Sequence, residues 1–261
     1  MLTQSKVKKH MTLLLLLLAE CVAADAATSV TYRLVHRSSR ENNRLITDHA
    51  LLYIQENGSL FIDRKSIRRK SASERNIPNH AKAGLLASIG MPYLKFYIKK
   101  HYRENHLHYI EEHHHAVEIP TPNRWRLTQK DSVIRGMNVH QAEGSFGNRK
   151  WTVWFTLEVP ISDGPYLFSG LPGLVLKAND NQGDFDFEVI GIERDVPENS
   201  LPKVPTYTLI PEKKFRAIRE QMANDPFAQI RSNGGTIQGD VTINGKKNVS
   251  RRILAPPQKR K

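Results

Sequence analysis

Histidines are the residues of this chain whose type and spacing most directly suggest chemistry. Six of its eleven histidines fall within fifteen positions: His101, His106, His108, His113, His114 and His115. A neutral imidazole is a good ligand for zinc or copper, and short histidine-rich tracts bind metals. In a β-strand, side chains two residues apart lie on the same face, so His106 would join His108 and His113 would join His115. Two imidazoles on one face could hold a metal weakly.

The same histidines also fit a polar strand face that binds nothing. The sequence contains neither H-E-x-x-H nor a Cys/His finger, and no third imidazole or carboxylate stands at a spacing that is diagnostic of a ligand set. We therefore favour the polar face and assign neither a metal nor another cofactor. The weak metal candidates are His106, His108, His113 and His115.

A second group of possible ligands consists of the carboxylates Asp180, Asp184, Asp186 and Glu188. Calcium in an EF-hand requires oxygen ligands at positions 1, 3 and 5 of its loop and glycine at position 6. Residues 179–183, NDNQG, do not satisfy that pattern. We therefore expect a solvent-facing hairpin here, without a bound cation.

Nucleophilic catalysis has little support in the sequence. The G-x-S-x-G motif of a nucleophile elbow is absent around Ser169–Gly170. Catalytic triads assemble from distant positions, so an exported hydrolase stays open as an alternative. No catalytic residue is assigned.

The segment SGLPGLVLK, residues 169–177, places an apolar turn among leucines. Proline followed by glycine predicts a type II turn in which Gly173 has a positive φ. Burial under a sheet is the favoured explanation of the leucines, and a contact surface with aromatic neighbours is the alternative. The candidate binding residues under the second interpretation are Leu171, Pro172, Gly173, Leu174, Trp154, Tyr166 and Phe168.

These residues must be positioned by strands, because apolar residues alternate with polar ones from residue 29 to residue 194. A strand is predicted over 151–161, with Pro160 at its end or at a sheet edge. Residues 174–178 and a strand from Phe185 to Val189 are predicted to form an antiparallel hairpin. Further strands are expected at 30–37, 50–55, 59–63, 94–102, 106–112, 125–129 and 133–142.

Sequential strands with short connections predict a mainly antiparallel β fold. We expect a curved sheet or open barrel with a C-terminal helix, and a two-sheet β-sandwich is the alternative. The basic, serine-rich stretch 64–75 and residues 76–88 are interpreted as a solvated loop with room for a short helical piece. The C-terminal helix is predicted over 211–223, where Phe215, Ile218 and Met222 share a face.

Residues 1–26 have the three parts of a secretory signal peptide. Basic residues precede an apolar run at 12–22, which is shorter than the roughly 20 residues of a transmembrane helix. An A-x-A cleavage site follows at 24–26. We therefore expect an exported protein of the periplasm or the cell surface, or a secreted one. Cys21 is the only cysteine, and a lipid anchor through Cys21 is an alternative, although Glu20 is a poor neighbour for that modification.

The sequence predicts four parts: a signal peptide (1–26), an antiparallel β domain carrying the GLPGL motif (27–200), a proline-rich linker and helix (201–228), and a basic, mobile tail (229–261). The formal net charge is +13. In an exported chain this positive charge favours an anionic partner in the cell envelope over nucleic acid. The alternative is that the charge keeps the protein soluble and has no specific partner. The partners that we consider are an envelope protein, a lipid or an anionic glycan, with any membrane association peripheral.

The stretch from Trp154 to Glu193, WFTLEVPISDGPYLFSGLPGLVLKANDNQGDFDFEVIGIE, resembles the GLPGLI family of exported Bacteroidota proteins. The likeness is strong over 124–194, weak over 29–123 and absent from the basic tail. Upstream positions that also look like the family are Trp125, Leu127, Ile134, Arg135, Gly136, Gln141, Ala142, Phe146, Gly147 and Arg149.

This chain departs from the family pattern at two places. Val175 stands where the family usually has isoleucine, and residues 136–142 lack the aromatic residue, cysteine and lysine of the usual G-Y-x-C-x-K-A segment. The resemblance implies a cell-envelope accessory protein and brings no activity, cofactor or catalytic residue. We therefore expect a non-catalytic accessory or binding protein. The alternatives are the exported hydrolase and a structural envelope protein whose motif serves only the fold.

Overall fold

The computed structural model describes residues 27–37, 44–104, 106–111, 114–121, 124–146 and 149–224. The predicted signal peptide with Cys21, the histidine at position 113 and the basic tail lie outside the described residues.

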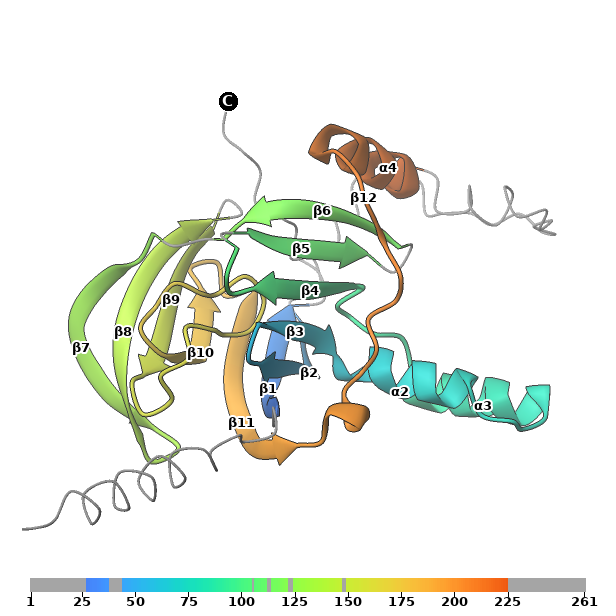
Figure 1. The fold of residues 1–261 in the computed structure, drawn as a ribbon, viewed down its shortest axis with the longest axis horizontal. Coiled ribbons are helices and arrows are strands. Elements are labelled where there is room, and N and C mark those ends of the chain that lie inside the picture. Colours follow the sequence, from blue (N-terminus) through green and yellow to red (C-terminus); the bar gives the residue numbers. More distant parts are fainter. Residues whose placement is uncertain are drawn as a thin grey trace, which may run out of the picture.

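Twelve strands of the described chain form one open, strongly curved sheet (Figure 1). The order across the sheet is β12-β6-β5-β4-β3-β2-β1-β11-β10-β9-β8-β7. Neighbouring strands are antiparallel except for the short β12, which runs parallel to β6. The predicted antiparallel β fold is confirmed, and its strands make one curved sheet instead of the two sheets of a sandwich. The strands are β1 (Ala27–Arg37), β2 (Leu45–Gln55), β3 (Gly58–Asp63), β4 (Phe96–His101), β5 (His106–Glu111), β6 (His115–Pro120), β7 (Arg126–Ile134), β8 (Met137–Phe146), β9 (Arg149–Thr156), β10 (Leu174–Asp180), β11 (Phe185–Val196) and β12 (Thr208–Leu209).

The sheet has two arms that meet at β1. One arm runs from β1 through β6 as a meander, and the other runs from β7 through β11 and returns to the free edge of β1. In Figure 1, strands β3–β6 run across the picture and strands β7–β10 run up it. The strands of the two arms therefore cross at a large angle. The core lies between them, and aromatic rings from both arms meet there: Phe61 and Phe187 pack edge to face at 6.2 Å.

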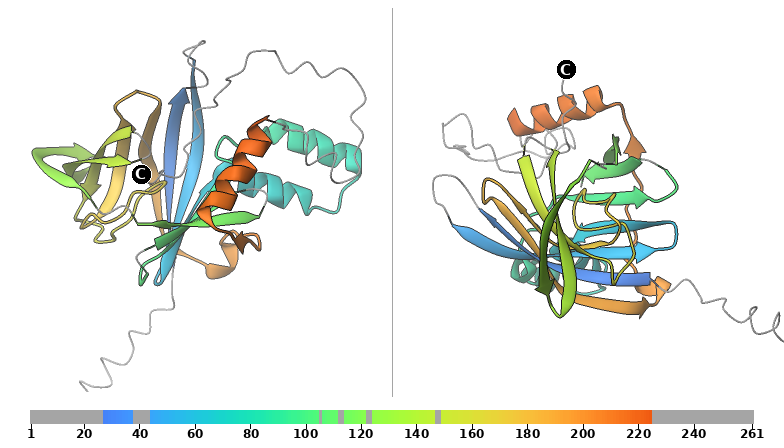
Figure 2. Two further views of the ribbon diagram at one scale, coloured as in Figure 1. Left: turned by 90° about the horizontal axis from the view of Figure 1, so that it is seen from above. Right: turned by 90° about the vertical axis from the view of Figure 1, so that its left-hand side faces the viewer.

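Two helices stand where we predicted a solvated loop. α2 (Arg64–Ser73) and α3 (Asn79–Ile89) connect β3 to β4 and lie beside the sheet (Figure 2). The Asp63 side chain accepts a hydrogen bond from the Lys65 backbone N–H and caps α2. Arg69 donates to the carbonyls of Leu86 and Gly90 and ties the two helices together. Each helix buries a single residue fully, so neither shows the apolar stripe by which sequence reasoning finds helices.

The predicted C-terminal helix is confirmed as α4 (Glu212–Asn224), which follows η1 (Glu198–Ser200) and β12. Its Phe215 side chain is buried and packs edge to face with Tyr109, with ring centroids 6.1 Å apart. Within the described residues, no helix combines the length and apolar character that crossing a membrane requires.

Several strand predictions have wrong boundaries: the strand predicted over 50–55 begins at Leu45, the one over 125–129 continues to Ile134, and two others fail for identifiable reasons. The predicted strand 151–161 ends at Thr156, because the alternation breaks there: Thr156 is buried and Leu157 is exposed. The predicted strand 133–142 is divided by a hairpin turn at Arg135 and Gly136, which have φ values of 52° and 80°. Two consecutive positive φ angles are typical of the type I′ turns that join antiparallel strands.

The hairpin of β10 and β11 is confirmed, with Ala178 opposite Phe187. Its carboxylates are not all solvent-facing, which corrects our expectation. Asp180 and Asp184 are buried at the turn and both pair with Arg149 of β9. Asp180 also accepts hydrogen bonds from the backbone N–H groups of Asp184 and Phe185. This cluster fixes the turn to the neighbouring strand.

The prediction that Gly173 adopts a positive φ is wrong, because the positive φ angles of this region occur at Tyr166 and Gly170. Glycine is required at 173 by a close approach instead. A Cβ at this position would lie 1.9 Å from the carbonyl oxygen of Thr156, the last residue of the paired strand β9. The segment SGLPGLVLK therefore enters β10 by passing directly over the end of β9.

We predict that Gly173→Ala lowers the free energy of unfolding by at least about 2 kcal/mol, because the new methyl group overlaps backbone that has no room to move. The control is Gly84→Ala on the exposed face of α3, where a Cβ meets no atom within 4 Å. That change should be neutral or stabilise by up to about 1 kcal/mol. Urea unfolding of both variants measures the difference, and equal stabilities would contradict the close approach.

Candidate functional site

The connection between β9 and β10, residues 157–173, lies inside the curve of the sheet (Figure 1). It is folded onto itself by short-range backbone bonds, such as that from the Asp163 N–H to the Ile161 carbonyl at 2.7 Å. Long-range hydrogen bonds from three side chains then attach this inner segment and the start of β10 to distant parts of the chain. Trp125 donates to the Ser169 carbonyl at 2.7 Å, Tyr32 to the Val175 carbonyl at 2.8 Å, and Lys100 to the segment at several points.

Lys100 is the central attachment point. Its ammonium group makes three hydrogen bonds to the inner segment: to Asp163 Oδ1 at 2.5 Å, to the Gly164 carbonyl at 2.7 Å and to the Phe168 carbonyl at 2.9 Å. These three acceptors match the three donors of an ammonium group. The side chains of Lys100 and Asp163 are 5% and 0% exposed. A charge pair this deep in the protein contributes little through attraction alone, but it leaves a costly unpaired charge if one partner is lost.

Tyr102, in the turn between β4 and β5, completes this network. Its hydroxyl donates to Asp163 Oδ2 at 2.6 Å, so both oxygens of the carboxylate are bonded. Burial raises the pKa of Tyr102, and the negative charge of Asp163 acts in the same direction. Burial lowers the pKa of Lys100, while the carboxylate of Asp163 opposes that change. The phenol therefore stays a proton donor throughout the physiological range.

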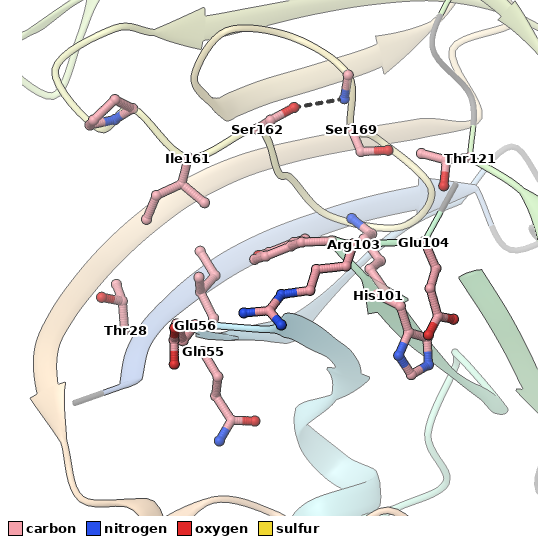
Figure 3. Close-up of a pocket in the computed structure, with 15 residues that line it drawn as sticks. Thr28, Gln55, Glu56, His101, Arg103, Glu104, Thr121, Ile161, Ser162 and Ser169 are labelled. Atoms are coloured by element: carbon pink, nitrogen blue, oxygen red, sulfur yellow. Dashed lines mark hydrogen bonds between the residues drawn. The ribbon is translucent and has the colours of Figure 1, made fainter. Parts of the chain in front are cut away.

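A pocket of about 740 Å³ opens beside this network (Figure 3). Its walls come from five parts of the chain: the start of β1, the β2–β3 turn, the end of β4 with the β4–β5 turn, the residue after β6 and the inner segment. Apolar surface comes from Ile54, Pro160 and Ile161, while the remaining lining groups are mostly hydroxyl, amide or charged. The polar and charged side chains in the lining are Thr28, Gln55, Glu56, Lys100, His101, Tyr102, Arg103, Glu104, Thr121, Ser162 and Ser169.

Figure 3 shows the Arg103 guanidinium group reaching across the pocket toward Gln55 and Glu56. Arg103 is exposed, unlike Lys100 at the pocket's base. Glu56 and Glu104 of the lining are exposed as well, so the pocket presents charges of both signs to a bound molecule. A guanidinium group presents several donors in a fixed plane and suits carboxylate or phosphate groups.

The pocket contains serines and a histidine, but their contacts do not form a catalytic pair. Ser162 Oγ accepts a hydrogen bond from the Gly170 N–H at 3.0 Å. Ser169 Oγ and His101 Nε2 are buried without a hydrogen-bond partner among the described residues. A hydrolase of the serine type needs a base within hydrogen-bond reach of its nucleophile.

The candidate binding residues chosen from the sequence occupy mostly interior positions. Leu171, Leu174, Tyr166 and Phe168 are at most 2% exposed and belong to the core, and Gly173 is buried against β9. Pro172 is exposed and Trp154 is half-buried. Binding through these residues stays a prediction, and their burial favours the packing interpretation of the motif.

The residues that the sequence reasoning missed are Lys100, Asp163 and Tyr102. A signal for the first was present in the sequence, since Phe96, Ile98 and Lys100 occupy alternate positions of one strand and the first two face the core. Lysine at an inward position requires a partner. The sequence does not show which residue is that partner, because Asp163 is 63 residues away from Lys100 and lies outside any regular element.

The histidines separate into two groups in the structure. His101, His106 and His108 come together on neighbouring strands, with ring centroids 4.8 to 5.8 Å apart. His115 begins β6 and lies opposite Thr208 of β12, while His114 hydrogen-bonds to the Thr206 carbonyl. Position 113, also a weak candidate, lies outside the described residues.

Comparison with known families gives one match. Residues 102–177 match the model of a family described as "Protein of unknown function (Porph_ging)". The matched region contains the inner segment and the GLPGL motif, but the match does not confirm the GLPGLI family name. No curated protein matches the chain.

Among solved structures, PNGF-II is similar in two crystal forms, P21 and C2, each with a TM-score of 0.53 and 16% sequence identity. The similarity covers 74% of this chain and 33% or 32% of PNGF-II, so this chain spans about a third of that protein. At this identity the likeness concerns the fold alone. A LolA superfamily protein from Nitrosomonas europaea matches with a TM-score of 0.29 and 9% identity over 69% of this chain and 91% of its own, and this likeness carries no argument.

We predict that Lys100→Met and Asp163→Asn each lower the free energy of unfolding by about 3–5 kcal/mol, because each leaves a buried polar partner without its counterpart. The double variant should lose less than the sum of the two, since neither unpaired charge then remains. Denaturant unfolding measures all three. Lys177→Met is the control, because Lys177 forms a half-exposed pair with Glu188 at 3.5 Å and should change stability by less than about 1 kcal/mol. Strict additivity would contradict a direct coupling.

Proposed function

We propose that this protein is a non-catalytic binding protein of the bacterial cell envelope, exported by its N-terminal segment, and that its ligand binds in the pocket beside the inner segment. The observation that carries the proposal is the pocket itself: an open volume of about 740 Å³ whose base is fixed by the buried Lys100–Asp163 pair. Binding sites are commonly concave and largely preformed. A base held by three long-range hydrogen bonds to Lys100 meets that description.

The chemistry of the pocket lining favours an anionic glycan as the ligand. The hydroxyl and amide groups of Thr28, Gln55, Thr121 and Ser162 can exchange hydrogen bonds with sugar hydroxyls. Arg103 offers a planar cationic group to an acidic substituent. The net charge of +13 would draw an anionic polymer toward the surface in general, but only these lining groups can give the interaction a defined place.

Membership of the GLPGLI family and export to the periplasm, cell surface or medium belong to this same proposal. They are supported by the sequence of residues 154–193 and by the signal-like segment 1–26. The match of residues 102–177 to a family of unknown function is compatible with both.

The proposal is tested by calorimetric titration of the chain with short, defined oligogalacturonides, which carry a carboxylate on each sugar, and with their uncharged methyl esters. We expect saturable binding of the acidic sugars and at least about tenfold weaker binding by Arg103→Gln, since a charge-assisted hydrogen bond contributes roughly 1.5–3 kcal/mol. Arg68→Gln is the matched control, because Arg68 is exposed on α2 and does not line the pocket.

Three results would count against the proposal. One is no binding by any acidic oligosaccharide. Another is an equal loss in Arg103→Gln and Arg68→Gln, which would show that the net charge alone binds the sugar. The third is a shortened oligosaccharide in the recovered mixture, detected by mass spectrometry, which would favour the hydrolase alternative.

A further inference from the structure

A cluster of imidazoles lies on β4 and β5, on the face opposite to the core, and a glutamate of β6 lies beside it. On β5, Leu107 and Tyr109 face the core, so the alternating His106 and His108 face away from it. The antiparallel register places Glu118 of β6 directly opposite His108. Cross-strand neighbours in such a sheet have Cβ atoms about 5 Å apart, so three potential metal ligands are gathered by the strand pairing itself.

The distances between the ligand atoms are short. One ligand atom from each of His106, His108 and Glu118 can be chosen so that all three lie within 4.8 Å of one another. His106 Nε2 lies 3.6 Å from Glu118 Oε2. Ligand atoms that lie about 2.0–2.2 Å from a tetrahedral zinc ion are roughly 3.5 Å from one another. Side-chain rotations that move the ligand atoms by about one ångström would therefore complete the site. Glu118 has that freedom, because its side chain is 57% exposed.

The orientation of the His108 ring is fixed by a hydrogen bond to one of its two nitrogens. Its Nδ1 hydrogen-bonds to the Tyr207 hydroxyl at 2.8 Å, which leaves Nε2 as its ligand atom. Metal-bound histidines usually have their other nitrogen held in this manner. Tyr207 directly precedes β12, so the strand that extends the sheet beyond β6 also supports the cluster.

His101 of β4 adds a third imidazole beside the two on β5. His101 Nε2 is buried and has no hydrogen-bond partner among the described residues, although its ring centroid is 4.8 Å from that of His108. A neutral imidazole keeps the lone pair that a metal requires. The Glu104 carboxylate, on a side chain that is 54% exposed, lies 2.8 Å from His106 Nε2 and would have to move away from it.

We propose that His106, His108 and Glu118 bind one divalent transition-metal ion, with zinc as the best match to two imidazoles and one carboxylate. The fourth position is left to water or to His101. None of these three ligands lines the proposed glycan pocket, although the neighbouring His101 does, so the two sites adjoin and are tested independently.

The test is calorimetric titration of the chelator-treated full chain with ZnCl₂. We expect one ion per chain with a dissociation constant in the micromolar range or below, and at least tenfold weaker binding by His106→Gln and by Glu118→Gln. Both side chains are partly exposed, so these variants should fold, and circular dichroism checks that they do. His108→Gln is expected to abolish binding. His80→Gln is the matched control, because His80 is exposed on α3 and should leave the affinity unchanged.

Two results would overturn the proposal. The first is no zinc binding by the wild-type chain up to a concentration of about 100 μM, well above the affinity of ordinary protein zinc sites. The second is wild-type affinity in both folded variants, His106→Gln and Glu118→Gln, which would place the ion elsewhere, for example on the tract 113–115. Loss of affinity in these two variants and its retention in His80→Gln would support the site.

Discussion

The three hydrogen bonds of the Lys100 ammonium group are the constraint on which the inner part of this structure depends. Each joins β4 to the inner segment across 63 to 68 residues of sequence. Taking an ammonium group out of water is expensive, and that cost is offset only when every donor is satisfied and an opposite charge lies nearby. Two backbone carbonyls and a carboxylate meet both conditions. Because those three acceptors belong to an irregular stretch of chain, the lysine also specifies the conformation in which that stretch packs.

This constraint explains why an apolar turn can lie inside a β-sheet protein. Residues 157–173 have no strand partners of their own, and a buried irregular segment must find hydrogen bonds for its backbone. Lys100, Trp125 and Ser162 provide several of them. With its backbone satisfied, the segment can bury Tyr166, Phe168 and Leu171 between the two arms of the sheet. The GLPGL motif thus completes the core. The polar residues Ser162 and Ser169 of the same segment line the pocket.

The sequence predicted the parts of the fold that follow from local rules. Alternating apolar residues identified most strands, and the β10–β11 hairpin and α4 were found from their turn and cap residues. Local rules failed where tertiary contacts decide the outcome. Strand β9 stops at Thr156 because the chain must turn inward there, and Gly173 is needed for a backbone contact that no turn statistic describes. The helices α2 and α3 bury too little surface to leave a periodic pattern, so their composition resembled that of a loop.

The histidine cluster shows the same limit for a candidate site. Spacing alone placed His106 and His108 on one face, and it could go no further, because a two-residue repeat is common to polar strand faces and metal sites. The third ligand, Glu118, is separated from His108 by ten positions of sequence and brought opposite it by the register of β5 and β6. A turn between these strands that was one residue longer would shift that register and turn Glu118 to the other face. The ligand set is therefore a property of strand pairing, and a histidine-rich tract becomes evidence for a metal only when its neighbours across the sheet are known.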